Sequence, residues 1–206
     1  MFNEETKVLL FDVETSGFIS KTIPANDPEQ AWAVQVGAIL STQNEDLDKI
    51  NHIIQANGRE MNYHAQKIHG ISIEQSETEG LPEIEVAEKF GLLLRQADMI
   101  VCHNFDFDWA FVYQMLERNI DDLSDEARSA FYLDLPSFCT MKSKEVKQHV
   151  KARNVKGAIK WPKLIELHEK LFGEGFADAH DAFADITATK NCFFELIKQE
   201  IITIEF

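Results

Sequence analysis

The chain alternates between short apolar runs and longer stretches in which apolar residues recur every three or four positions. Residues 7–12 (KVLLFD) form the first short run, and such runs are typical of buried strands. Residues 32–40 (WAVQVGAIL) form a second run, and the polar residues 41–45 after it favour a hairpin turn. Further strands are predicted at residues 46–55, at 99–102 and within 133–141.

Helical periodicity is clear from Pro82 to about Ala97, where Ile84, Ala87 and Phe90 fall on one face. Proline is favoured in the first turn of a helix, so Pro82 marks the start of this one. The same spacing predicts helices at residues 63–69, 107–118, 161–172 and 180–199.

The order of these elements predicts an α/β fold. Three strands in a meander are followed by helices that alternate with strands, which indicates a mixed sheet rather than a purely parallel one. The length of 206 residues fits a single domain spanning residues 1–206. No apolar run approaches the roughly 20 residues that span a bilayer, so no membrane partner is expected.

Charge is distributed unevenly along the chain. The net charge is −15, yet residues 142–163 hold eight basic residues and one acid, a local charge of +7. An acidic body argues against a passive nucleic-acid-coating protein, whereas the basic insert, at about residues 142–160, suits an enzyme that grips a polyanion at its edge. A solvated, lysine-rich loop is the alternative interpretation of this stretch.

The cysteines indicate a reducing compartment. Cys102, Cys139 and Cys192 are scattered, odd in number and form no CxxC pair. The first seven residues are acidic and polar, unlike a signal peptide. We therefore expect a cytoplasmic protein without a structural zinc site.

Acidic side chains gather in three separated segments. Asp12 and Glu14 end the first strand, and residues two apart in a strand share a face. Asp108 lies near the start of the helix after residues 99–102, and we expect Asp106 to cap that helix. Asp185 lies in the first turn of the last helix, with His180 at or just before its start.

Four carboxylates from three elements repel one another unless cations lie between them. Carboxylate oxygens are ligands that Mg²⁺ and Mn²⁺ prefer. The set therefore predicts a site for two ions, about 4 Å apart, of the kind that hydrolyses phosphodiesters. A histidine beside such a site is a candidate general base, because its pKa lies near neutrality.

The acidic segments closely resemble the three motifs of the DEDDh 3′–5′ exonucleases. This family includes the proofreading epsilon subunit of bacterial DNA polymerase III and RNase T. The resemblance covers about residues 7–199, and it implies an RNase H-like fold with a mixed five-stranded sheet flanked by helices. The segments that carry it are DVETSGF (12–18), IHGIS (68–72), HNFDFD (103–108), KWPKLIELHEKLFGE (160–174) and HDAFAD (180–185).

The resemblance also implies roles for individual residues. The metal ligands would be Asp12, Glu14, Asp108 and Asp185, holding two Mg²⁺ or Mn²⁺ ions, and His180 would deprotonate the attacking water. The aromatic side chain of Phe18 would stack on or wedge against the unpaired end bases. The substrate-binding residues are expected to be Thr15, Gly17, Phe18, Asn104 and Phe111.

The function expected from this resemblance is metal-dependent 3′–5′ hydrolysis of DNA ends to 5′-mononucleotides, of the proofreading or repair type. Single-stranded DNA is favoured because of residues 160–174. An RNA exonuclease of the RNase T or oligoribonuclease type is the first alternative. A catalytically idle module that binds a polymerase or a nucleic-acid end is the second. A DNA polymerase is a candidate partner, although the chain ends at Phe206, soon after the last helix, which favours a stand-alone nuclease.

Overall fold

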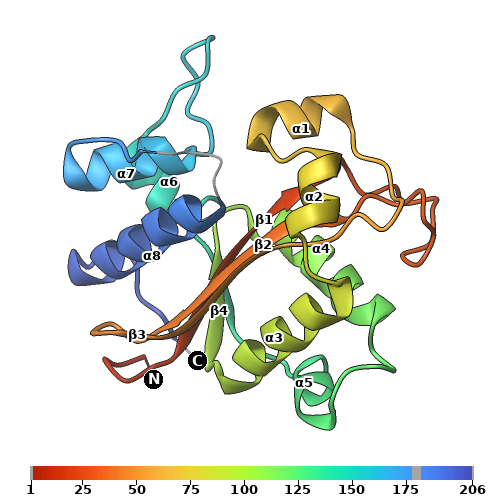
Figure 1. Ribbon diagram of the computed structural model, residues 1–206. Helices are drawn as coiled ribbons and strands as arrows, with labels where there is room; N and C mark the ends of the chain where they lie inside the picture. The colour runs from red at the N-terminus through yellow and green to blue at the C-terminus, as the bar shows by residue number, and fades with distance from the viewer. Residues whose placement is uncertain (1, 178–181, 206) are drawn as a thin grey trace.

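The computed structural model describes residues 2–177 and 182–205. Its centre is a five-stranded sheet in the order β3-β2-β1-β4-β5, seen edge-on in Figure 1. β1 is antiparallel to β2, which is antiparallel to β3, whereas β1, β4 and β5 are mutually parallel. The sheet is therefore mixed, as predicted. The strands are β1 (Val8–Thr15), β2 (Ala33–Ser41), β3 (Asp46–Ile53), β4 (Met99–Cys102) and β5 (Ser137–Cys139).

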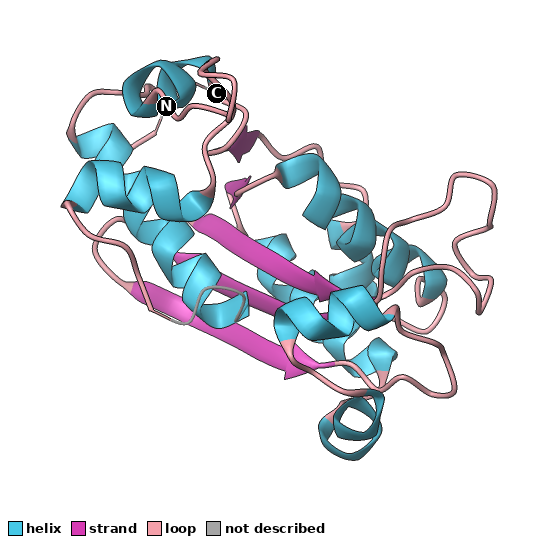
Figure 2. Ribbon diagram, turned by 90° about the horizontal axis from the view of Figure 1, so that it is seen from above, coloured by secondary structure: helices cyan, strands magenta, loops and turns pink. Residues whose placement is uncertain are grey.

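Helices cover both faces of the sheet (Figures 1 and 2). One layer holds α3 (Glu83–Gln96), α4 (Phe105–Arg118) and α5 (Asp125–Ala130), and the other α6 (Lys144–Val150), α7 (Leu164–Phe172) and α8 (Ala182–Lys198). Two short helices, α1 (Tyr63–His69) and α2 (Ile73–Glu79), lie beyond the end toward which β1 points. No described helix is long and apolar enough to cross a membrane.

Alternation along β1 decides which side chains meet which layer. Leu9, Phe11 and Val13 pack with the layer of α3 and α4. Val8 and Leu10 pack with α8 on the opposite face. Because side chains two apart share a face, Asp12 and Glu14 also lie on the side of α8.

Most predicted elements are confirmed; three short helices, α2, α5 and α6, were not predicted, and the other differences lie at the ends of elements. β1 continues to Thr15 because β2 pairs with it up to Ala33, across an irregularity between Glu14 and Thr15. α4 begins at Phe105, and its N-cap is Asn104, in the left-handed conformation with φ 79°. The expectation that Asp106 caps this helix was therefore wrong.

Candidate active site

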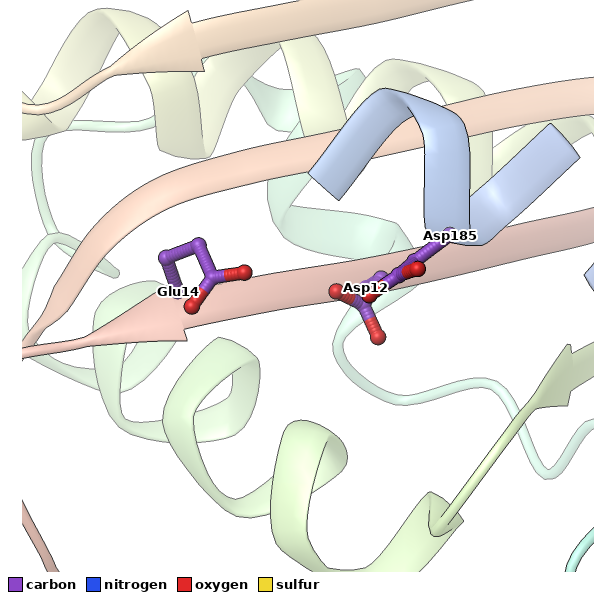
Figure 3. Close-up of side chains that lie close together, drawn as sticks. All are labelled: Asp12, Glu14 and Asp185. Atoms are coloured by element: carbon purple, nitrogen blue, oxygen red, sulfur yellow. The ribbon is translucent and has the colours of Figure 1, made fainter. Parts of the chain in front are cut away.

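Three carboxylates meet where β1 passes under the start of α8. Oxygens of Asp12, Glu14 and Asp185 all lie within 4.8 Å of one another, and all three residues are half-buried. Figure 3 shows Asp185 reaching from the first turn of α8 toward Asp12, with Glu14 farther along β1. The structure thus brings these three predicted residues together.

A glycine in β2 lets α8 come close enough to do this. Gly37 pairs with Asp12 in the register of the two strands. A Cβ atom at Gly37 would lie 2.3 Å from Cδ1 of Ile186, the residue after Asp185, and 3.6 Å from Ala182. The missing side chain therefore makes room for the first turn of α8.

The fourth predicted carboxylate, Asp108, is not among the three whose oxygens come together, and it is only 4% exposed. The Cys102 thiol donates a hydrogen bond to its Oδ2 over 3.1 Å. Burial is the main cause that raises the pKa of Asp108 to about 7, and the negative charge of Asp185 also raises it. Hydrogen bonds from the Cys102 thiol and from the backbone N–H groups of Val13 and Asp108 act in the opposite direction and lower this pKa. Asp108 therefore lies near enough to Asp185 for the two charges to interact.

This donor set fits hard divalent cations. It offers carboxylate oxygens and no nitrogen or thiolate ligand among Asp12, Glu14, Asp108 and Asp185. Like charges this close are unfavourable together, and a cation among them would reverse that cost. The cluster is an acidic group able to hold a metal ion.

A largely apolar pocket of about 370 Å³ opens beside Glu14. Three predicted substrate residues, Thr15, Gly17 and Phe18, line it. The Thr15 hydroxyl donates to the Gly17 carbonyl over 3.1 Å, which shapes the turn after β1. Phe18 is 86% exposed and meets Phe107 edge-on, with ring centroids 6.1 Å apart. The pocket thus joins the carboxylates to an exposed aromatic wall.

Comparison with known proteins identifies the family. The model of the RNase T exonuclease family matches residues 9–193. The chain belongs to this exonuclease family. No curated protein matches the chain significantly.

Solved structures show the same fold. E. coli exonuclease I in complex with a dT13 oligonucleotide matches with a TM-score of 0.74 and 19% identity over 95% of this chain. A product-bound structure of exonuclease I matches with a TM-score of 0.72 and 17% identity over 95% of this chain. The zinc-bound E. coli ExoI–ssDNA complex matches with a TM-score of 0.69 and 19% identity over 95% of this chain. The chain spans 42%, 45% and 41% of those chains, less than half of each.

Two of the predicted substrate-binding residues do not line the pocket. Phe111 is 1% exposed and packs in the core, so the expectation that it lines the substrate groove was wrong; Phe107, one turn earlier, lines the pocket instead. Asn104 is the N-cap of α4 and is not part of the pocket lining. His180 lies outside the described residues.

Sequence reasoning missed the far wall of the pocket. Asn62, His64, Ile68 and His69 line it from α1 and the residue before it. The segment 68–72 marked this region as a family landmark without a role. Burial lowers the pKa of His69, whose Nδ1 accepts the Ile71 backbone N–H over 3.1 Å, so we expect a neutral ring there.

Proposed function

We propose that the chain is a metal-dependent 3′–5′ exonuclease that removes 5′-mononucleotides from DNA ends. One observation carries the proposal: a cluster of three carboxylates, with oxygens within 4.8 Å, adjoins a pocket that includes Glu14 itself. A terminal nucleotide held in the pocket would present its phosphodiester to the carboxylates.

The four carboxylates Asp12, Glu14, Asp108 and Asp185 would hold two Mg²⁺ or Mn²⁺ ions. The chemistry that two such ions supply in a phosphodiesterase is activation of water and stabilisation of the leaving oxygen. Asp12 lies in β1 and Asp185 in α8, so their backbones are already in place before substrate binds. Such preorganisation lowers the entropy that is lost when the reacting groups come together. His180, five residues before Asp185, would take the proton of the attacking water.

The pocket would hold the terminal nucleotide by stacking and shape. Phe18 and Phe107 offer aromatic faces, and every base has a π-face to stack on them, so recognition would tolerate any sequence. Removing one stacking partner of this kind costs about 1–3 kcal/mol per base. Thr15 and Gly17 would meet the sugar and phosphate through the turn after β1.

DNA is the proposed substrate class because residues 160–174 resemble the epsilon-like nucleases, and because exonuclease I, a structural match, was solved with dT13. RNA is the alternative. Choice between the two depends on contacts to the 2′-hydroxyl. If DNA is the substrate, we expect the pocket to make no favourable contact with the 2′-hydroxyl of a ribonucleotide.

Matched 5′-labelled DNA and RNA oligonucleotides with Mg²⁺ test this proposal. We expect a ladder that shortens from the 3′ end of DNA, with a larger kcat/KM than on RNA. A ladder on RNA alone would move the chain to the RNA-processing branch. Release of internal fragments, or no cleavage of either strand, would contradict the exonuclease assignment.

A further inference from the structure

The basic arm, residues 142–163, contains α6 and an ordered hairpin. Arg153 and Ile159 pair across the hairpin, the Lys160 N–H donates to the Ala152 carbonyl over 2.8 Å, and the Asn154 N–H donates to the Ala158 carbonyl over 2.9 Å. Figure 1 shows the hairpin standing out beyond α6 and α7. The arm is thus an exposed projection whose two sides are joined by backbone hydrogen bonds.

Most of the positive charge on the arm is available for a partner. Lys142 pairs with Asp106 and Lys160 with Glu166, each over 2.6 Å. The Lys147 ammonium lies 4.3 Å from the centroid of the Trp161 ring. The remaining cations are exposed and form no ion pair with any residue in the described ranges: Lys144, Lys151, Arg153, Lys156 and Lys163.

The arm is attached beside the carboxylate cluster. Its first residue, Lys142, pairs with Asp106, two positions before Asp108. The sulfur of Cys139 accepts the backbone N–H of Lys142 over 3.3 Å and that of Phe105 over 3.4 Å. The arm therefore starts at the same helical turn that carries Asp108.

We propose that the basic arm binds the phosphates of the substrate strand upstream of its 3′-terminal nucleotide. This inference rests on the proposed function. The strand has to leave the pocket past the cluster, and outside residues 142–163 the chain carries 12 basic and 34 acidic residues, a charge of −22 that repels a polyanion. Lysine and arginine contacts to phosphate are independent of sequence, as an exonuclease requires.

The test compares two double variants in EDTA, where no cleavage occurs. Lys151→Glu/Lys156→Glu alters the arm, and Lys89→Glu/Arg95→Glu alters exposed residues of α3 on the other face of the sheet. Both take the net charge from −15 to −19. Affinity for a fluorescent single-stranded DNA 20-mer is measured by anisotropy against salt concentration.

The arm variant should bind on the order of tenfold more weakly at 0.1 M salt, and its log–log salt slope should be smaller by roughly 1.4, for two lost phosphate contacts. The α3 variant should keep the wild-type slope. Equal slopes and affinities for the two variants would overturn the proposal.

A small substrate separates this inference from the proposed function. The p-nitrophenyl ester of thymidine 5′-monophosphate has no upstream phosphates, so with Mn²⁺ both variants should hydrolyse it at the wild-type rate. If the wild type hydrolyses neither this ester nor single-stranded DNA while the binding difference persists, the proposed function fails and the basic arm stands only as a surface that binds single-stranded DNA. A matching loss of ester hydrolysis and binding in the arm variant would contradict a role confined to upstream phosphates.

Discussion

The Cys102 thiol makes a polar contact inside an otherwise apolar strand. It is fully buried, and it donates to Oδ2 of Asp108 over 3.1 Å. Burial is the main cause that raises the pKa of Cys102 well above its ordinary value, and the charge of Asp108 adds to it, so the sulfur remains a protonated donor. The thiol therefore fixes one oxygen of Asp108 and favours the charged carboxylate.

Cys102→Ala should weaken Mn²⁺ binding about tenfold at pH 7, the usual effect of losing a partner that orients a metal ligand. Without the donor the pKa of Asp108 rises further, so the loss should shrink toward pH 9. Cys102→Ser, which keeps a donor, should bind nearly as the wild type does. Calorimetric titration between pH 6 and 9 checks this.

The control is Cys192→Ala, which removes another fully buried thiol, from α8. It should leave Mn²⁺ affinity unchanged at every pH. Wild-type affinity in Cys102→Ala would show that the thiol fills space and does not position Asp108.

At this scale, sequence spacing predicted that acidic side chains would lie together but not which groups would contact them. Alternation in a strand was enough to put Asp12 and Glu14 on one face. Cys102 follows three apolar residues, so nothing marked its thiol as a donor. Phe111 was misplaced because apolar residues at helical spacing, such as Phe107 and Phe111, do not reveal which of them faces the core.

At the scale of elements, the close approach of α8 to β2 assembles the site. Gly37 leaves the space that Ile186 occupies, and Asp185 precedes Ile186 in the first turn of α8. A side chain at position 37 would force Ile186, the neighbour of Asp185, to shift. A residue that carries no chemistry thus makes room for the turn that holds Asp185.

Gly37→Ala should lower the free energy of unfolding by about 1–3 kcal/mol, as overpacking of a core does. It should also reduce turnover, because Asp185 moves with Ile186. Ile186→Val removes the atom that clashes and alone should cost about 0.5–1.5 kcal/mol. The double variant should then be more stable than the sum of the two single changes; strict additivity in urea unfolding would contradict this packing.

Three short helices were not predicted, because their sequences carry little apolar periodicity. α2, α5 and α6 have seven, six and seven residues, and only one or two side chains of each are buried, so no apolar stripe marks them along the sequence. Each begins after a serine whose hydroxyl accepts a backbone N–H three residues on: Ser72, Ser124 and Ser143. The capping pattern from Ser72 to Gln75 was a usable signal.

At the scale of the whole molecule, one ion-pair network joins distant segments. Glu83 of α3 binds Arg59 over 2.9 Å and Arg118 of α4 over 2.7 Å. Arg118 also donates to the carbonyl of Ala25, in the long loop after β1. The network therefore ties the loop that carries Phe18 to the helices behind the sheet.

This network predicts a pH dependence of stability. Burial alone would raise the pKa of Glu83, but the hydrogen bonds and charges of Arg118 and Arg59 outweigh it and lower that pKa. A lowered pKa adds stability above the unfolded value of about 4.3, and this contribution disappears as the pH falls through the folded pKa. Glu83→Gln should cost about 3 kcal/mol at pH 7, because two arginines lose their partner.

Urea unfolding of the wild type and Glu83→Gln at pH 7 and pH 3 measures this effect. The difference in unfolding free energy between the two proteins should narrow at pH 3, below the unfolded value of about 4.3, because the unfolded state of the wild type then takes up a proton more readily than folded Glu83 does. Lys142→Gln is a suitable control, because its ion pair with Asp106 is exposed and should contribute little. A difference that does not change with pH would exclude Glu83 as the titrating group.

The central claim is that the carboxylates at β1 and α8 hold the cations that drive 3′-end hydrolysis. Its most direct test is cleavage of 5′-labelled single-stranded DNA by the wild type and Asp12→Ala, each with Mg²⁺, Mn²⁺ or EDTA. We predict a 3′-shortening ladder only for the wild type with metal, while Asp12→Ala stays folded and is at least as stable, because carboxylate repulsion is relieved. Cleavage in EDTA, or wild-type cleavage by Asp12→Ala, would contradict the account.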